Sequence, residues 1–134
     1  MLDIEKNTPI AAPIDKVWAA LTDPTSIRGW MGDDDTIAVE LCVGGHYQLF
    51  GGETSGVFTQ IENPNKLAYT WRQGEWHKDW PDSLVSWELT PIGQETQVLL
   101  THSRFPNLAE RDGHDEGWDI YFLGPMKKWL ESNT

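Results

Sequence analysis

Cysteine is almost absent from this chain of 134 residues, and basic side chains are scarce. The single cysteine, Cys42, permits no internal disulfide, which favours a reducing compartment. Ten lysines and arginines stand against 21 aspartates and glutamates, which gives a net charge of −11. Because such a charge repels nucleic acids and anionic membranes, we expect neither of them as a partner.

Long apolar runs and common catalytic motifs are missing as well. No apolar stretch approaches the roughly 18 residues that a membrane-spanning helix needs, so we expect no membrane insertion. The first residues, MLDIEKN, lack the apolar segment of a signal peptide, and a cytoplasmic protein is therefore expected. The sequence contains no glycine-rich phosphate loop, nucleophile elbow or CxxC motif, and we expect no cofactor.

The length predicts a single domain, residues 1–134, and its content of aromatic residues is unusual. There are eight tryptophans: Trp18, Trp30, Trp71, Trp76, Trp80, Trp87, Trp118 and Trp129. Solid cores rarely contain so many, because each buried indole N–H needs a hydrogen-bond acceptor. Large aromatic residues suit the wall of an apolar ligand cavity, which we favour over a filled aromatic core.

The end of the sequence, from Asp115 to Ser132, predicts one long amphipathic helix with Asp115 as its N-cap. At 3.6 residues per turn, one broad face gathers Trp118, Tyr121, Phe122, Pro125, Met126 and Trp129. Pro125 should leave the Tyr121 carbonyl without its helical partner and bend the helix there. A concave apolar surface must receive the aromatic face.

The preceding sequence predicts a sheet that can provide this surface. A first strand over Asp3–Ile10 is followed by a helix that opens at Ala12–Asp15 and by a second short helix over Ser26–Trp30. From Thr36 onward, apolar and polar residues alternate with a period of two, and turn residues separate about six strands. The pattern is typical of an α+β fold in which a curved antiparallel sheet wraps around the C-terminal helix.

Motifs spread along nearly the whole chain carry a resemblance to a known family. They are Ala12–Trp18, Leu21–Pro24, Trp30, Gly44-Gly45, Gly56-Val57, Leu67–Trp71, Glu95–His102, His114 and Gly117-Trp118. In this order they resemble the START-related, birch-pollen-allergen-like helix-grip superfamily (SRPBCC). More closely, they are similar to the C-terminal domain of the activator of the ninety-kilodalton heat-shock chaperone's ATPase and to its small bacterial relatives. The resemblance implies a cavity between sheet and helix but no single reaction, because relatives include lipid binders, cyclases, aromatases and chaperone activators.

Eight residues are our candidates for the wall of this cavity: Trp30, Tyr47, Tyr69, Trp71, Trp87, His102, Trp118 and Phe122. Their rings would supply apolar and stacking contacts, while His102 and the tyrosine hydroxyls would orient a polar group. We expect a small apolar or aromatic ligand that is bound without being transformed. Trp76 should lie in an exposed loop over residues 74–82.

Two other functions remain open. The first is an enzyme of the cyclase or aromatase type, with His102 as its acid or base. The second is a protein-interaction module that contacts a chaperone, as the family resemblance implies. His102 and His114 could lie together at the cavity mouth, or they could serve structure by hydrogen bonding and fixing the helix start. The spacing of potential ligands does not suggest a metal site.

Overall fold

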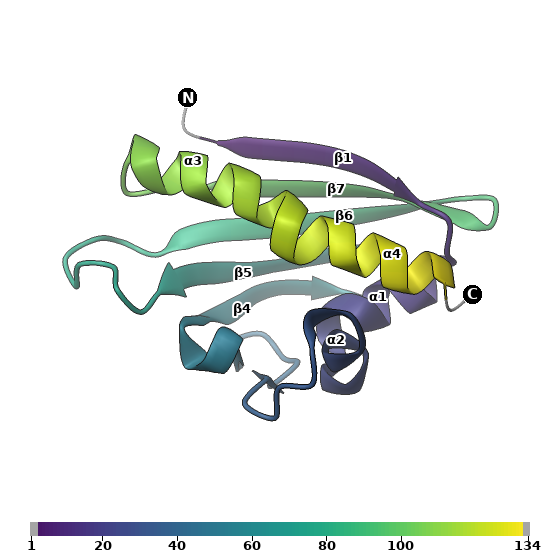
Figure 1. Ribbon diagram of the computed structural model, residues 1–134, viewed down its shortest axis with the longest axis horizontal. Helices are drawn as coiled ribbons and strands as arrows, with labels where there is room; N and C mark the ends of the chain where they lie inside the picture. Colours follow the sequence, from purple (N-terminus) through teal and green to yellow (C-terminus); the bar gives the residue numbers. More distant parts are fainter. Residues whose placement is uncertain (1–2, 133–134) are drawn as a thin grey trace.

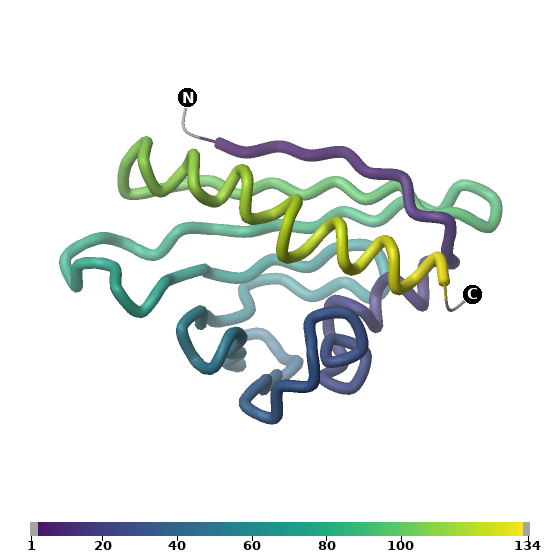
Figure 2. The backbone as a smooth tube through the Cα atoms, viewed as in Figure 1, coloured from purple at the N-terminus to yellow at the C-terminus, as the bar shows by residue number. Residues whose placement is uncertain are grey.

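A seven-stranded antiparallel sheet carries the C-terminal helix across one of its faces (Figure 1). The computed structural model describes residues 3–132. The strands lie in the order β1-β7-β6-β5-β4-β3-β2, so that the first strand of the chain pairs with the last. This is the α+β helix-grip arrangement that the sequence predicts. The tube in Figure 2 shows the helix running obliquely over the strands.

The strands are β1 Ile4–Ile10, β2 Ala38–Val39, β3 His46–Leu49, β4 Thr54–Glu62, β5 Lys66–Gln73, β6 Ser83–Ile92 and β7 Glu95–Ser103. Strand β2 is shorter than the alternation from Thr36 to Leu41 predicts. It is an edge strand whose sole neighbour, β3, is itself short, and short edges resist unwanted pairing. The helices α1 (Ile14–Thr22) and α2 (Pro24–Met31) follow β1, and Asp23 separates them.

Three neighbouring strands, β5, β6 and β7, turn their alternate side chains toward the helix. The buried members are Leu67, Tyr69 and Trp71 of β5, Val85, Trp87 and Leu89 of β6, and Val98, Leu100 and His102 of β7. These are the inward faces that the period-two alternation predicts. Their burial against the helix supplies much of the core, because apolar area removed from water contributes about 25 cal/mol per Å².

Strand β4 departs from regular pairing where the sheet curls. Val57 N–H donates to the side-chain Oγ1 of Thr70 at 2.9 Å, and the register shifts a few residues later, between Phe58 and Gln60. A Cβ at Gly56 would lie only 1.9 Å from the Thr70 carbonyl oxygen and 2.7 Å from the Tyr47 ring. Glycine therefore permits the close approach of two backbones at this bend.

The C-terminal helix begins earlier than the sequence predicts. It consists of α3 (Leu108–Gly117), the π-helical turn η2 (Trp118–Leu123) and α4 (Gly124–Ser132). The prediction of Asp115 as N-cap is wrong, because Asn107 caps the helix by accepting from Glu110 N–H at 2.9 Å. Residues 108–114 carry no buried side chain, so their sequence shows none of the apolar periodicity that marks a helix.

The irregularity expected at Pro125 takes the form of the π turn directly before it. Gly124 N–H donates to the Asp119 carbonyl, five residues back, in place of the usual four-residue spacing. The turn changes which side chains face the sheet. Trp118, Phe122 and Met126 of the predicted face are buried, whereas Tyr121 is 63% exposed.

Contacts near the middle and at the C-terminal end of the helix fix its position on the sheet. Where α3 meets η2, Lys6 of β1 lies 3.0 Å from the carboxylates of both Asp115 and Asp119. At the α4 end, the Trp129 ring packs over α2, where Gly29 leaves room for it. Figure 1 shows this end beside α1 and α2. The first half of the helix, α3, is therefore held over the sheet although none of its own side chains is buried.

We expect Gly56→Ala to lower the free energy of unfolding by about 1–3 kcal/mol, the usual cost of forcing extra volume into a packed site. The matched control is Gly113→Ala, because a Cβ at Gly113 meets no atom within 4 Å. That substitution should raise stability by about 0.5–1 kcal/mol through helix propensity. Urea unfolding followed by tryptophan fluorescence measures both, and equal effects of the two alanines would contradict this account of the bend.

Candidate functional site

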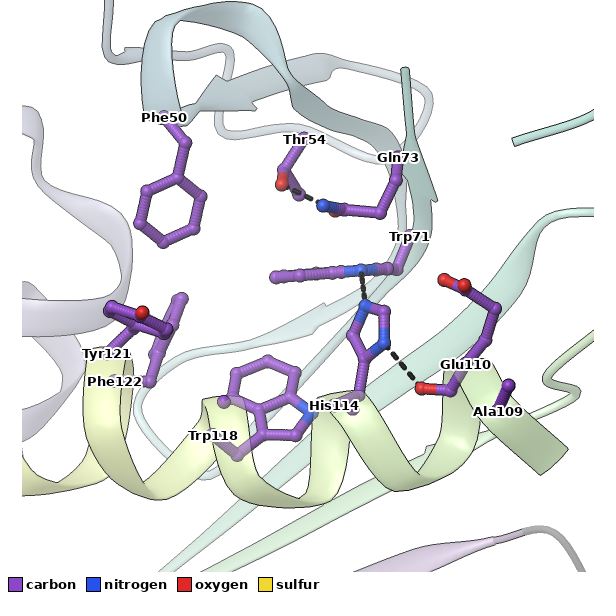
Figure 3. A pocket seen from close by; sticks show the side chains of 12 residues that line it. Phe50, Thr54, Trp71, Gln73, Ala109, Glu110, His114, Trp118, Tyr121 and Phe122 are labelled. Atoms are coloured by element: carbon purple, nitrogen blue, oxygen red, sulfur yellow. Dashed lines mark hydrogen bonds between the residues drawn. The ribbon is translucent and has the colours of Figure 1, made fainter. Parts of the chain in front are cut away.

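An open cavity of about 370 Å³ lies between the first half of the C-terminal helix and the sheet. Its walls come from α3 and η2, from the ends of β4 and β5, and from the 3-10 turn η1 (Phe50–Gly52). The lining residues are Phe50, Thr54, Trp71, Gln73, Ala109, Glu110, Gly113, His114, Gly117, Trp118, Tyr121 and Phe122 (Figure 3).

Small residues on the helix create this space. Ala109, Gly113 and Gly117 are spaced four apart, so they share one face of α3, and that face lines the cavity. A Cβ at Gly117 would meet only the Tyr121 ring, at 3.8 Å. Each glycine costs the helix up to about 1 kcal/mol relative to alanine. The two glycines therefore lower the stability of α3 on the face that lines the cavity.

Aromatic rings form the deep wall of the cavity. The ring centroids of Trp118 lie 4.9 Å from those of Trp71 and 4.7 Å from those of Phe122. Tyr121 and Phe50 stand at the rim, and both are partly exposed. Phe50 has a φ of 54°, a left-handed conformation that is unfavourable for a bulky residue. Such strain persists only where the surrounding structure imposes it, and here it belongs to a residue at the cavity rim.

His114 is a wall residue whose ring is fixed by two hydrogen bonds (Figure 3). Its Nε2 accepts from the indole N–H of Trp71 at 3.0 Å. Its Nδ1 lies 2.7 Å from the carbonyl oxygen of Glu110, so Nδ1 carries the proton and donates. The ring therefore joins β5 to α3 and holds the Trp71 indole in the cavity wall.

His102 lies behind this wall and is fully buried. Its Nδ1 accepts from the indole N–H of Trp118 at 3.0 Å, which places the ring proton on Nε2. Nε2 lies 2.8 Å from Ser83 Oγ, and that hydroxyl donates to the Trp71 carbonyl. Burial, with a smaller contribution from nearby His114, lowers the pKa of His102 to about 2. The imidazole is thus held neutral, with both nitrogens engaged.

Three other buried indoles, those of Trp87, Trp30 and Trp76, also have acceptors. Trp87 donates to the Tyr69 hydroxyl at 2.9 Å, and Trp30 donates to the Ala20 carbonyl at 2.9 Å. The expected exposure of Trp76 is wrong. This residue is 5% exposed, because its indole folds against α3 and donates to Glu110 Oε1 at 2.5 Å. No buried side-chain nitrogen or oxygen lacks a partner in the part of the chain that the structure describes.

A second space of about 20 Å³ lies deeper, on the other side of Phe122. Among its lining residues are Trp30, Tyr47, Tyr69 and Phe122. The Tyr47 hydroxyl donates to the Thr70 carbonyl at 2.6 Å, and burial raises the pKa of both tyrosines well above the ordinary value. The Phe122 ring separates the two spaces.

The structure divides the eight predicted residues into three groups. Trp71, Trp118 and Phe122 line the open cavity, and Trp30, Tyr47 and Tyr69 line the small inner space. Trp87 and His102 line neither of these two spaces. The hydroxyls of Tyr47 and Tyr69 and the imidazole of His102, predicted to orient a polar group of the ligand, form hydrogen bonds within the core.

Sequence reasoning missed the helix residues of the wall. If the helix is predicted to begin after Asn107, the spacing of Ala109, Gly113 and Gly117 places these three small residues on one face. The available signal was the cap itself, since Asn107 is followed by Glu110 at the third helical position. Phe50, Thr54 and Gln73 carry no comparable signal, because tertiary structure alone brings them to the cavity.

The described residues offer no metal site and no membrane span. Within residues 3–132, no group of three His, Cys, Asp or Glu side chains is arranged to hold a metal ion. No helix in this range is long and apolar enough to cross a membrane.

Solved structures similar to this one come from several organisms. An Hsp90 activator from Plasmodium falciparum is 26% identical, with a TM-score of 0.84 over 96% of this chain and 95% of that one. CalU16 from Micromonospora echinospora is 26% identical, with a TM-score of 0.79 over 98% and 77%. The Aha1 dimer from Colwellia psychrerythraea is 23% identical, with a TM-score of 0.81 over 98% and 97%, a likeness of fold.

Sequence comparison agrees with these structures. A Schizosaccharomyces pombe protein is 30% identical over 74 residues, which are 55% of this chain but only 21% of that protein. The family described as Activator of Hsp90 ATPase homolog 1-like protein matches residues 11–131, nearly the whole chain. The chain therefore belongs to this family, within the helix-grip superfamily that its motifs resemble.

Proposed function

We propose that this protein binds a small, mainly apolar or aromatic molecule in the open cavity, in the cytoplasm, without transforming it. The observation that carries the proposal is a cavity of about 370 Å³ whose deep wall is aromatic and for which Ala109, Gly113 and Gly117 of the helix leave room. The volume lies within the range of roughly 300–1,000 Å³ that small-molecule sites occupy.

The cavity has an apolar end and a polar end. Tyr121 and Phe122 lie at one end, and Gln73 and Glu110 lie at the other (Figure 3). Thr54 Oγ1 donates to Gln73 Oε1 at 2.6 Å, which fixes the amide in the wall. A ligand would place a ring or chain against the indoles and direct a polar group toward this amide and carboxylate.

We expect Gly117→Leu to weaken binding of the neutral fluorescent probe N-phenyl-1-naphthylamine about tenfold or more, because the new side chain occupies the ligand's space. The matched control is Glu116→Leu, which adds the same side chain one residue away, at an exposed position outside the cavity lining. Fluorescence titration and thermal shift provide the readout, since a bound ligand stabilises the fold by RT ln(1 + [L]/Kd).

Two outcomes would contradict the proposal. The first is that no apolar probe binds or stabilises the parent protein at up to millimolar concentration. The second is that the two leucine variants bind the probe equally, because binding would then occur away from the α3 face that lines the cavity.

The cyclase or aromatase alternative relies on His102 as acid or base. Such a group must reach the substrate, and it works best with a pKa near the operating pH. His102 is fully buried behind Trp71 and Trp118, both ring nitrogens are bonded within the core, and its pKa is lowered to about 2. These features favour binding over acid–base chemistry at this residue.

We expect the His102 ring to stay neutral from pH 8 to pH 4, so that its C–H resonances in NMR spectra do not shift. The unfolded chain takes up a proton at this residue below pH 6.5, whereas the folded chain does so only near pH 2. Stability contributed by the neutral ring is therefore present above pH 6.5 and falls by roughly 1.4 kcal/mol per unit as the pH drops.

Urea unfolding at pH 6.5 and pH 4.5 isolates this effect when the parent is compared with His102→Gln. Other groups titrate similarly in both proteins, so the parent should lose about 2–3 kcal/mol more than the variant over this interval. An imidazole resonance that titrates near pH 6 would refute the account and return His102 to consideration as an acid or base.

Chaperone contact is the second candidate function, and family membership favours it. The Hsp90 activator from Plasmodium falciparum is matched over 95% of its solved chain. The test is the ATPase rate of a cognate Hsp90, one from the organism that makes this protein, measured against rising concentrations of this protein. A saturable increase would support it, and a flat response at concentrations where the cavity binds its probe would reject it.

A further inference from the structure

We propose that the cavity selects a small organic cation, an amine that carries an apolar ring or chain, and that Glu110 receives its charge. This inference rests on the proposed function and adds to it the charge of the ligand. It follows from three features of the cavity: a carboxylate at its polar end, a lining that contains no lysine or arginine among the described residues, and aromatic rings around the remaining volume.

Glu110 is the one lysine, arginine, aspartate or glutamate side chain among the residues that line the cavity. Figure 3 shows it at the end opposite Tyr121 and Phe122. Its Oε1 accepts from the Trp76 indole at 2.5 Å, which fixes the carboxylate in place. Within residues 3–132, neither a hydrogen-bond donor nor a basic side chain contacts its Oε2. An ammonium group is a donor that would satisfy this oxygen and the charge together.

Basic side chains on the neighbouring elements are already paired with other carboxylates. Arg72 of β5 lies 3.2 Å from Asp82, and Arg111 of α3 lies 3.2 Å from Asp112 and 3.5 Å from Asp115. The wall also contains His114, whose two ring nitrogens are bonded to Trp71 and to the Glu110 carbonyl.

Carboxylates beside the rim increase the negative potential. Glu53 precedes the wall residue Thr54, and its side chain is hydrogen bonded to Glu75. That hydrogen bond is the main cause of a raised pKa for Glu53, as expected where two acidic groups meet. With a net charge of −11, the whole chain also attracts cations and disfavours carboxylate ligands.

The aromatic rings suit the same class of ligand. Trp71, Trp118 and Phe122 form the deep wall, and Tyr121 and Phe50 stand at the rim. Aromatic faces attract ammonium groups through their quadrupoles and also accept apolar rings by stacking. A ligand that combines the two parts can use the indoles with its ring and the Glu110 carboxylate with its amine.

Three probes of the same shape and different charge test the proposal: 1-naphthylmethylammonium, 1-naphthylmethanol and 1-naphthoate. Calorimetric titration in 150 mM salt should show the ammonium binding about tenfold tighter than the alcohol, with the carboxylate weakest. Glu110→Gln should reduce the preference for the ammonium to about twofold or less, because its amide oxygen still accepts from Trp76 but carries no charge. Glu116→Gln removes the same charge from an exposed position on α3 and should leave the preference unchanged.

The outcomes separate this inference from the function on which it rests. Equal affinity for the three probes, or tightest binding of 1-naphthoate, would overturn the inference and leave small-molecule binding intact. An equal loss of preference in the two glutamine variants would assign the effect to the overall charge and overturn the role of Glu110. If no probe binds the parent protein, both the inference and the proposed function fail.

Discussion

Hydrogen bonds from two indoles to two histidines are the constraint on which the packing of helix against sheet depends. An indole N–H can only donate, so Trp71 and Trp118, once buried, require acceptors inside the core. His114 on α3 accepts from Trp71 of β5, and His102 of β7 accepts from Trp118 of the π turn. Each bond crosses the interface between the two layers. Because an accepting nitrogen carries no proton, the same bonds fix the tautomer of both rings. Both histidines therefore have a structural role.

The two halves of the helix illustrate how a packed core and a cavity can share one element. In α4, Met126 and Leu130 are buried, and Trp129 packs over α2. In α3, no side chain is buried, and hydrogen bonds and ion pairs hold the helix above the sheet instead. The cavity therefore lies where polar contacts replace apolar packing. The π turn between the halves directs Trp118 and Phe122 toward the sheet and leaves Tyr121 at the rim.

The fold could be predicted from the sequence because the apolar residues that form its core recur with the periods of strands and helices. Alternation placed Trp71, Trp87 and His102 on inward faces, and helical spacing placed Trp118 and Phe122 opposite them. The candidate site was predicted only in part, for a related reason. A helix that lines an empty space buries nothing, so residues 108–114 lack the apolar pattern by which helices are recognised. The segment that the pattern failed to reveal is thus the segment that shapes the cavity.

The same reasoning limits what membership of a family can say about the ligand. Most motifs that carry the family resemblance, such as Leu67–Trp71 and Glu95–His102, lie outside the first half of the C-terminal helix, in elements where packing restricts the choice of side chain. Ala109, Glu110 and Gly113, which give the cavity much of its volume and its charge, lie outside these motifs, on the half of the helix that packing restricts least. A change at Ala109 or Gly113 would alter the site without removing a contact of the core. One fold can therefore support different ligands, and the ligand must be argued from these side chains and not from the fold.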